Sequence, residues 1–306
     1  MKKFGIIGMS EGNAHPYSWS SIINGVYDGN EIKKVGYPAV AAYLKANEDT
    51  LGILNAEVTH IWTQDTRMSD SIAGSSGIAH VMQRAEDMIG EVDAVILARD
   101  DAENHVTMSR AFIEAGLPVF IDKPLATNQE DLHWFTEQER SGKLIMSCSS
   151  MRYANECRIV KQEMDKLGPL ELVTAVGKKD WLKYGVHMLE AIIASLDDPQ
   201  AHSVQHIGDS DQNIVHIVFE NGLRATIHLF KDITPTFQVS YFGREAWRMA
   251  DIKNSYSMFR DNIIEFARSV EEGKSRLPFS KTVNIINCLV AAQASHDAGG
   301  TTIYLK

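Results

Sequence analysis

A candidate nucleotide-binding turn opens the chain, in the segment GIIGMSEGNAHPYSW. A strand that runs into a tight turn and then a helix forms an anion site, because free backbone N–H groups and the helix dipole point at bound phosphates. Gly8 supplies the first glycine of the pattern GxGxxG, but Ser10 and Asn13 stand at the second and third glycine positions. We therefore expect the side chains of Ser10 and Asn13 to bind the phosphate, together with the groups that His15 and Tyr17 contact.

A carboxylate follows the next apolar run along the chain. Asp65 ends the segment VTHIWTQD, where an acidic side chain can accept hydrogen bonds from an adenosine ribose, and this favours NAD over NADP. Arg67, two residues later, weakens that preference. The structural alternative is that Gly8 only makes a turn and that Asp65 is simply solvated.

These side chains need a sheet to position them. Up to about residue 124, short apolar runs alternate with amphipathic stretches, which is typical of a doubly wound parallel sheet. We expect strands at FGIIG, VTHIWTQD, DAVILA, LPVFIDKP and KLIMSCSS, and helices over 18–26, 69–78, 80–92 and 105–116. The segment 28–55 is longer than a usual connection and predicts a small helical insertion. Thr127 and Glu130 form a candidate capping box for a helix through Gln138.

The pattern changes after Met151. A helix over 156–167, a strand at ELVTAVG and a helix containing YGVHMLEAIIASL precede strand-like runs at SVQHIG, IVHIVF, LRATIHLF and FQVSYFG. Consecutive strands indicate antiparallel pairing. Two closing helices, 259–271 and 283–295, precede a last strand at TIYLK. We therefore predict an α/β protein with a Rossmann-type domain over 1–124 and an α+β domain with a large, mostly antiparallel sheet over 125–306.

Composition excludes several classes of function. The 306 residues include 44% hydrophobic and 23% charged residues, with no apolar run near the roughly 20 residues of a membrane span. A net charge of -10 without a basic cluster argues against nucleic acid as a partner. The three cysteines form no CxxC pair, so we expect buried thiols and no metal site. The start, MKKFGIIG, does not predict a signal peptide, and we expect a cytoplasmic protein.

Several segments resemble one family, the Gfo/Idh/MocA oxidoreductases, and the resemblance covers nearly the whole chain. The segment DAVILARDDAENHVTMSRAFIEAGLPVFIDKPLA resembles the family's strand, Asn/His turn, helix and strand ending in Glu-Lys-Pro, which here reads Asp122-Lys123-Pro124. YGVHMLE is similar to the family's GxHxxD and gives Gly185, His187 and Glu190. The tail, with FRDNIIEFARSVEEGK and SHDAGG before TIYL, also resembles the family's closing elements.

The resemblance implies hydride exchange between a nicotinamide and a secondary alcohol on a sugar or cyclitol, with Lys123 and His187 beside the reacting carbon. An imidazole, with an ordinary pKa of about 6.5, suits the transfer of the hydroxyl proton. A fixed ammonium stabilises the developing alkoxide and orients the hydroxyl. Pro124 would direct Lys123 through a cis peptide bond. The residues expected to contact the cofactor are Gly8, Ser10, Asn13, Asp65, Arg67, Arg99, Asn104, His105, Asp122 and Pro124.

Two departures from the family pattern bear on activity. Lys183 replaces the acidic residue four positions before the histidine, and Asp180 has a different spacing. If Lys183 and Lys123 face one cleft, their repulsion would leave one of them neutral enough to act as a base; the alternative is that Lys183 points to solvent or meets an anionic substrate. Arg99-Asp100 also replaces the usual Thr-Pro, which implies different contacts to the cofactor.

The sequence therefore predicts an NAD(P)-dependent oxidoreductase acting on a carbinol carbon of a sugar, nucleotide-sugar or cyclitol. One alternative is a non-catalytic binder of dinucleotides or sugars, since the altered turn and the lost acid are changes expected when hydride chemistry disappears. Another is an epimerase that keeps its cofactor bound. The open face of the C-terminal sheet predicts a homodimer or homotetramer.

Overall fold

The computed structural model describes residues 1–305 and divides them into two compact units. The first unit comprises 1–125, 133–147 and 259–279, and the second comprises 126–132, 148–258 and the described residues from 280 onward. The two units thus interleave along the chain, whereas the sequence alone suggested one boundary near residue 124. They are described separately below.

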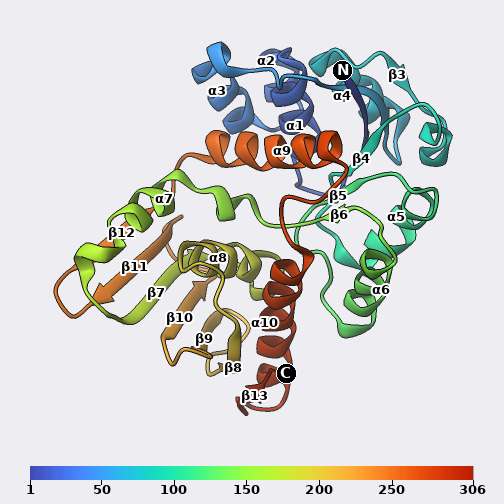
Figure 1. The fold of residues 1–306 in the computed structure, drawn as a ribbon. Coiled ribbons are helices and arrows are strands. Elements are labelled where there is room, and N and C mark those ends of the chain that lie inside the picture. The colour runs from blue at the N-terminus through green and yellow to red at the C-terminus, as the bar shows by residue number, and fades with distance from the viewer. Residues whose placement is uncertain (306) are drawn as a thin grey trace. The chain divides into compact units, whose positions relative to one another are not determined.

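A six-stranded parallel sheet organises the first unit (Figure 1). Two of its inner strands, β4 (Ala94–Leu97) and β5 (Val119–Ile121), are apolar and buried along their whole length, as expected for parallel strands covered on both faces. In spatial order the strands are β3 (His80–Val81), β2 (Ala56–Trp62), β1 (Lys2–Ile7), β4 (Ala94–Leu97), β5 (Val119–Ile121) and β6 (Ile145–Met146). The order reverses between β1 and β4, which is where ligands bind in folds of this class. The predicted doubly wound sheet is confirmed.

Helices connect these strands. They are α1 (His15–Asn24), α4 (Thr66–Ser76), α5 (His105–Glu114) and α6 (Gln129–Arg140). The insertion over 28–55 folds as predicted into a small helical excursion, with α2 (Gly29–Lys34), α3 (Pro38–Ala46) and the 3₁₀ turn Glu48–Thr50. The Asp28 side chain caps α2 by accepting from the backbone N–H groups of Asn30 and Glu31.

Helix α9 (Ser255–Glu272) joins this unit although it lies far along the sequence. The Phe266 ring packs against Phe4 on β1 and Phe120 on β5, with centroid distances of 5.6 and 5.5 Å. Because these buried aromatic contacts hold α9 against the sheet, the first unit recruits a segment that the sequence pattern assigned to the second.

Two local predictions were wrong. The segment 80–92 is not one helix: His80 and Val81 pair with the edge of β2, and a 3₁₀ turn over Ala85–Met88 follows. Pairing with the open sheet edge thus outweighed the helical spacing of the apolar residues. Helix α6 begins at Gln129 and is capped by Asn128, whose side-chain oxygen accepts from the Asp131 backbone N–H at 2.8 Å, rather than by Thr127.

The second unit contains a seven-stranded, mostly antiparallel sheet. Its strands, in spatial order, are β12 (Trp247–Asp251), β11 (Phe237–Gly243), β7 (Leu170–Lys178), β10 (Arg224–Phe230), β9 (Gln212–Phe219), β8 (Ala201–His206) and β13 (Ile303–Tyr304). The pair β7 and β10 is parallel, and β12 is a strand that the sequence pattern did not predict. The predicted α+β architecture is confirmed.

One face of this sheet is covered by helix α8 (Trp181–Ser195), which contacts β7, β10 and β11 (Figure 1). The helices α7 (Asn155–Gln162) and α10 (Phe279–Asp297) and the 3₁₀ turns Ser150–Tyr153 and Met164–Leu167 complete the unit. On the other face, side chains alternate outward along each strand, so that Phe242, Trp247 and Met249 are exposed at one end.

The cysteines, possible metal-binding groups and possible membrane spans were the subject of expectations from the sequence. Cys148, Cys157 and Cys288 are all buried free thiols, as predicted. Over residues 1–305, no group of three His, Cys, Asp or Glu side chains has a geometry that would hold a metal ion. Within the same range, none of the helices is long and apolar enough to span a bilayer.

Candidate nucleotide and catalytic site

The carboxyl ends of the parallel strands gather the predicted site residues of the first unit. Gly8 follows β1, Asp65 follows β2, Arg99 follows β4 and Lys123 follows β5. Since parallel strands end at one edge of the sheet, these residues share that edge, at the point where the strand order reverses.

The turn after β1 requires glycine at its first position. The Gly8 backbone N–H donates to the Trp62 carbonyl at 3.1 Å, which ties the turn to β2. A Cβ atom at Gly8 would lie 2.6 Å from Cγ of Pro16, in the first turn of α1. The rigid proline ring cannot move aside easily, so any larger residue must displace the start of α1.

The two residues at the missing glycine positions both donate hydrogen bonds to carboxylates. The Ser10 hydroxyl donates to Asp100 Oδ1 at 2.6 Å and lies 3.1 Å from the Asp100 backbone nitrogen. The Asn13 side-chain amide donates to Asp122 Oδ2 at 2.9 Å. The turn is therefore clamped to the loops that follow β4 and β5 through its own side chains.

Asp122 is the most buried carboxylate at this edge, with a side chain only 1% exposed. His15 Nδ1 lies 2.5 Å from its Oδ2, and the Lys123 backbone N–H donates to its Oδ1 at 2.7 Å. Burial by itself would raise the pKa of Asp122, but His15, Lys123 and Asn13 outweigh burial and lower that pKa to about 2. Asp122 is therefore ionised in the folded protein at neutral pH.

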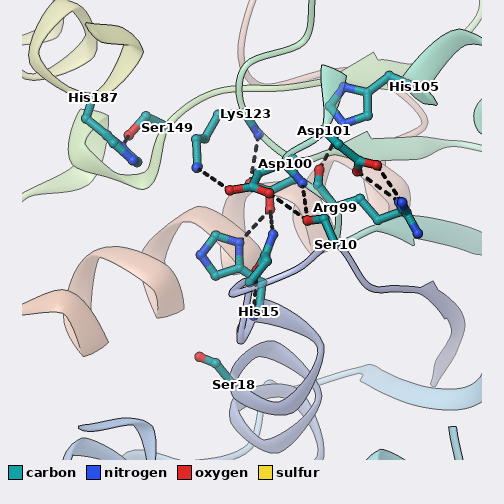
Figure 2. Close-up of polar contacts among 12 residues, drawn as sticks. Ser10, His15, Ser18, Arg99, Asp100, Asp101, His105, Lys123, Ser149 and His187 are labelled. Atoms are coloured by element: carbon teal, nitrogen blue, oxygen red, sulfur yellow. Dashed lines mark hydrogen bonds and ion pairs between the residues drawn. The ribbon is translucent and has the colours of Figure 1, made fainter. Parts of the chain in front are cut away.

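Lys123 is also nearly buried, and its ammonium lies 3.5 Å from Asp100 Oδ2; the two side chains are 7% and 14% exposed. The Lys123–Pro124 peptide bond is cis, as the family resemblance implied, and Gly8–Met9 is cis as well. Asp100 thus contacts both Ser10 in the turn and Lys123 after β5 (Figure 2). Sequence reasoning singled out the run Arg99-Asp100-Asp101 but did not pair Asp100 with Lys123.

Arg99, Asn104 and His105 organise the loop after β4. The Arg99 guanidinium forms a two-pronged ion pair with Asp101, and the Asn104 amide donates to the same carboxylate at 2.7 Å. The fully buried His105 ring places Nδ1 3.1 Å from the Leu125 carbonyl and Nε2 2.8 Å from the Arg99 carbonyl. Arg99 and Asn104 thus order the loop after β4 through Asp101, and His105 links this loop to the segment after β5.

Asp65 and Arg67 lie at the start of α4. The Asp65 side chain caps this helix by accepting from the Arg67 backbone N–H at 3.0 Å, and it also pairs with the Arg67 guanidinium at 3.2 Å. The hydrogen bonds from Arg67 lower the pKa of Asp65. Asp65 remains 41% exposed, so its carboxylate is accessible to a ligand at the end of β2.

In the second unit, His187 lies on α8 and is held by a residue outside that helix. Its Nδ1 is 2.5 Å from the hydroxyl of Ser149, a fully buried residue just before the 3₁₀ turn Ser150–Tyr153 (Figure 2). The imidazole also packs against Tyr184 and Phe237, with centroid distances of 5.2 and 6.4 Å. No motif in the sequence connects Ser149 with His187.

The remaining residues of the GxHxxD-like segment have structural surroundings. Glu190 is 1% exposed and accepts from Arg152 Nε at 2.6 Å, while Arg152 Nη1 donates to Asp198 at 2.8 Å. Burial raises the pKa of Glu190 to about 7 against the opposing pull of Arg152. A Cβ atom at Gly185 would lie 2.8 Å from the Trp181 indole, so only glycine fits there without a shift. Lys183 is exposed in the first turn of α8, where its backbone N–H donates to the capping side chain of Asp180.

The predicted site residues thus fall into two groups. Gly8, Ser10, Asn13, Arg99, Asn104, His105, Asp122, Lys123 and Pro124 belong to one connected network at the sheet edge of the first unit, and Asp65 and Arg67 lie on the neighbouring strand end. His187 and Lys183 belong to α8 in the second unit. Their roles in binding or catalysis stay predictions.

The first group of residues has several features that suit a nicotinamide dinucleotide. Helix α1 has no acidic residue in its first turn, which suits an anion at its start. The exposed carboxylate of Asp65 suits a ribose. The two other carboxylates near the turn, Asp100 and Asp122, each lie against a basic side chain, Lys123 and His15, which limits their repulsion of a pyrophosphate. The residues present therefore fit such a group.

The doubly wound sheet, the turn held by side chains after β1 and the nearly buried Lys123 are typical of the dinucleotide-binding class of α/β proteins. Residues 32–149 match the model of an oxidoreductase family with an NAD-binding Rossmann fold, GFO_IDH_MocA. The resemblance to the Gfo/Idh/MocA family is thereby confirmed over these residues.

Two curated relatives are inositol dehydrogenases. Inositol 2-dehydrogenase 3 of Saccharopolyspora erythraea is 34% identical over 119 residues, which cover 38% of this chain and 35% of the relative. Inositol 2-dehydrogenase of Cereibacter sphaeroides is 26% identical over 199 residues, which cover 57% of this chain and 59% of the relative. The matches thus span less than two thirds of either relative.

Solved structures share the fold over nearly the whole chain. Myo-inositol 2-dehydrogenase from Lactobacillus plantarum superposes with a TM-score of 0.79 and 13% identity, covering 100% of this chain and 99% of the other. Scyllo-inositol dehydrogenase from Lactobacillus casei, with bound NAD(H) and scyllo-inositol, gives a TM-score of 0.76 at 13% identity and covers 99% of both chains. At these identities the likeness establishes the fold.

Proposed function

We propose that the protein is an NAD(P)-dependent oxidoreductase that exchanges a hydride between a nicotinamide and a carbinol carbon of a cyclitol or a related sugar. The observation that carries this proposal is the nearly buried Lys123 ammonium at the strand-end edge, next to a turn of the nucleotide-binding type. The inositol dehydrogenases among the relatives support the choice of a cyclitol.

The chain's own residues have distinct roles in this proposal. Lys123 orients the substrate hydroxyl and stabilises the negative charge that develops on its oxygen, and Asp100 holds the ammonium in place. His187 is the candidate for holding or moving a proton, because an imidazole is suited to that role near neutral pH. Lys183 is the further candidate for proton exchange.

A bound nicotinamide dinucleotide would accept or donate the hydride. Asp65 would hold its adenosine ribose, and the turn at Gly8 with the start of α1 would hold its pyrophosphate. The Asp65 carboxylate can accept hydrogen bonds from the ribose hydroxyl of NAD. Arg67 already pairs with Asp65 and is therefore less available to the 2′-phosphate of NADP, so we expect a preference for NAD.

A second candidate function is a non-catalytic family member. The side chains of Ser10 and Asn13 favour this alternative. They donate hydrogen bonds to Asp100 and Asp122, so they are already engaged by the protein's own carboxylates. Binding of NADH distinguishes a dinucleotide site from none, and turnover distinguishes an enzyme from a binder.

A homodimer or homotetramer formed through the C-terminal sheet is part of the proposal. The outward face of that sheet exposes Phe242, Trp247 and Met249, which a second copy of the chain would cover. A cytoplasmic location also stays a prediction.

The direct test combines binding and turnover. Fluorescence titration with NADH and NADPH should show tighter binding of NADH, and myo- or scyllo-inositol should support reduction of NAD. Lys123→Met should lower kcat/KM by about 10²- to 10³-fold, the usual effect of losing one group that stabilises a developing oxyanion. Lys34→Met, which removes an exposed lysine of the first unit, is the control. Wild-type protein that binds neither dinucleotide would refute the proposal.

A further inference from the structure

The hydrogen bonds of Ser149 determine which nitrogen of His187 carries its proton. Ser149 is fully buried, and its hydroxyl oxygen accepts from the Met151 backbone N–H at 3.1 Å. The same oxygen lies 2.5 Å from His187 Nδ1. A serine hydroxyl has one proton to donate and two lone pairs to accept with.

The hydroxyl proton needs an acceptor because it is buried away from water. Within residues 1–305, the hydrogen-bonding groups that Ser149 Oγ meets are the Met151 N–H, which is a donor, and His187 Nδ1. A proton on Nδ1 would make both neighbours of the Ser149 oxygen donors and would leave the hydroxyl proton buried without an acceptor, which is costly.

The position of Ser149 is itself fixed. Its backbone N–H donates to the buried carboxylate of Glu190, on the same helix as His187, and Arg152 Nε donates to that carboxylate at 2.6 Å. The backbone of Ser149 is therefore held in place, and its hydroxyl stays in contact with Nδ1 of His187.

We propose that Ser149 is a positioning residue that fixes His187 in the tautomer with Nδ1 unprotonated and the proton on Nε2. This inference rests on the proposed function, and it narrows the role of His187 in that reaction to holding a proton on Nε2. The neutral ring then presents an N–H donor on the nitrogen away from Ser149, and it polarises the substrate oxygen by hydrogen bonding. It cannot take the hydroxyl proton at Nε2 in that tautomer, so Lys123 or Lys183 becomes the candidate base.

This assignment differs from what the family pattern implies. An acidic side chain four positions before the histidine would lie on the same helix face, where it could accept from a ring N–H. Position 183 is a lysine here, which has no acceptor. In this protein the Ser149 hydroxyl, a donor from a different segment, takes the place of the carboxylate acceptor. The proton of the His187 ring is therefore expected on Nε2, the nitrogen that does not face Ser149.

The test reads the ring nitrogens directly. Full-length protein labelled with ¹⁵N in its histidines is studied by long-range ¹H–¹⁵N correlation at pH 8, and the His187 signals are assigned by their loss in His187→Gln. The wild type should show a protonated Nε2 and an unprotonated, hydrogen-bonded Nδ1. In Ser149→Ala both signals should move toward the averaged shifts of a ring that exchanges between tautomers, and Ser149→Thr should restore the wild-type pattern.

Activity supplies the second measurement. Loss of one neutral hydrogen bond predicts a fall in kcat of about five- to tenfold in Ser149→Ala, with recovery in Ser149→Thr. Ser195→Ala is the matched control, because it removes another buried hydroxyl from α8 and should leave the His187 signals unchanged.

A protonated Nδ1 in the wild type, or His187 signals that do not change in Ser149→Ala, would overturn the inference. Failure of the wild type to bind NADH or to turn over an inositol would refute the proposed function instead. The spectra of the ring nitrogens would still decide the tautomer in that case, so the two failures are distinguishable.

Discussion

His15 and Asp122 lie 107 residues apart in the sequence, yet the imidazole Nδ1 of one is 2.5 Å from a carboxylate oxygen of the other. The contact joins the turn after β1 to the end of β5. The imidazole also stacks on Trp19 with a centroid distance of 4.3 Å, so the pair is supported from within α1. The first residue of α1 and the first residue of the Asp-Lys-Pro segment therefore depend on each other.

Stability below pH 4 should depend on this pair. The pKa of Asp122 falls from 3.8 to about 2 on folding, so its contribution is complete above pH 4 and is lost as the pH falls through about 2. The shift corresponds to about 2 kcal/mol of unfolding free energy. In denaturant titrations, the difference in stability between wild type and Asp122→Asn should shrink by that amount between pH 5 and pH 2. The exposed Asp87→Asn serves as the control.

Substitution of Gly8 should abolish dinucleotide binding. In Gly8→Val, the new side chain meets the ring of Pro16 at the first turn of α1, and the displaced turn can no longer present its N–H groups to a phosphate. We expect NADH affinity to fall at least about tenfold, or about 1.4 kcal/mol, in fluorescence titrations. Gly74→Ala, in α4 with open space around it, should bind NADH normally. Equal affinity for all three proteins would show that the turn is not the phosphate site.

Asp65→Asn should change the preference between coenzymes. Asparagine caps a helix as well as aspartate does, so the start of α4 should be preserved while the charge disappears. Without the carboxylate, Arg67 is free to meet a 2′-phosphate, and the ratio of NADH to NADPH affinity should fall by about tenfold. Asp70→Asn, an exposed change in the same helix, serves as the control. An unchanged ratio would remove Asp65 from the adenosine site.

The outward face of the C-terminal sheet should mediate self-association. Trp247 and Met249 are 59% and 45% exposed on β12. Light scattering should give a multiple of 34.1 kDa for the wild type and a smaller assembly for Trp247→Glu, because a buried unpaired charge opposes the interface. Leu54→Glu changes another exposed apolar residue, in the first unit, and should leave the mass unchanged. A wild-type monomer would contradict the prediction.

Much of the fold could be predicted because its strands and helices have strong local patterns. DAVILA is a buried parallel strand, and the glycine that ends the helix of 69–78, Gly77, adopts the left-handed conformation with a φ of 68°. The strand β12 could not be predicted, since WRMAD has only one buried position and depends on its neighbour β11.

The candidate site was predicted residue by residue, but its connections were not. Asp100 and Lys123, or Ser149 and His187, meet only through the tertiary fold, and nothing in their local sequence predicts the partner. A hydroxyl or carboxylate near a histidine has no spacing rule when the two residues come from different elements. The family motif identified Lys123 and His187, whereas the groups that hold them required coordinates.

The parallel pairing of β7 with β10 has a consequence for folding kinetics. Leu172 pairs with Arg224, and the intervening chain contains α8, β8 and β9. Pairing the two strands closes a loop that contains this whole segment. Such non-local closure is slow, because the chain loses conformational entropy before the contacts between the strands stabilise the product. The helix that bears His187 lies inside the crossover, so changes to its buried face should slow refolding as well as reduce stability.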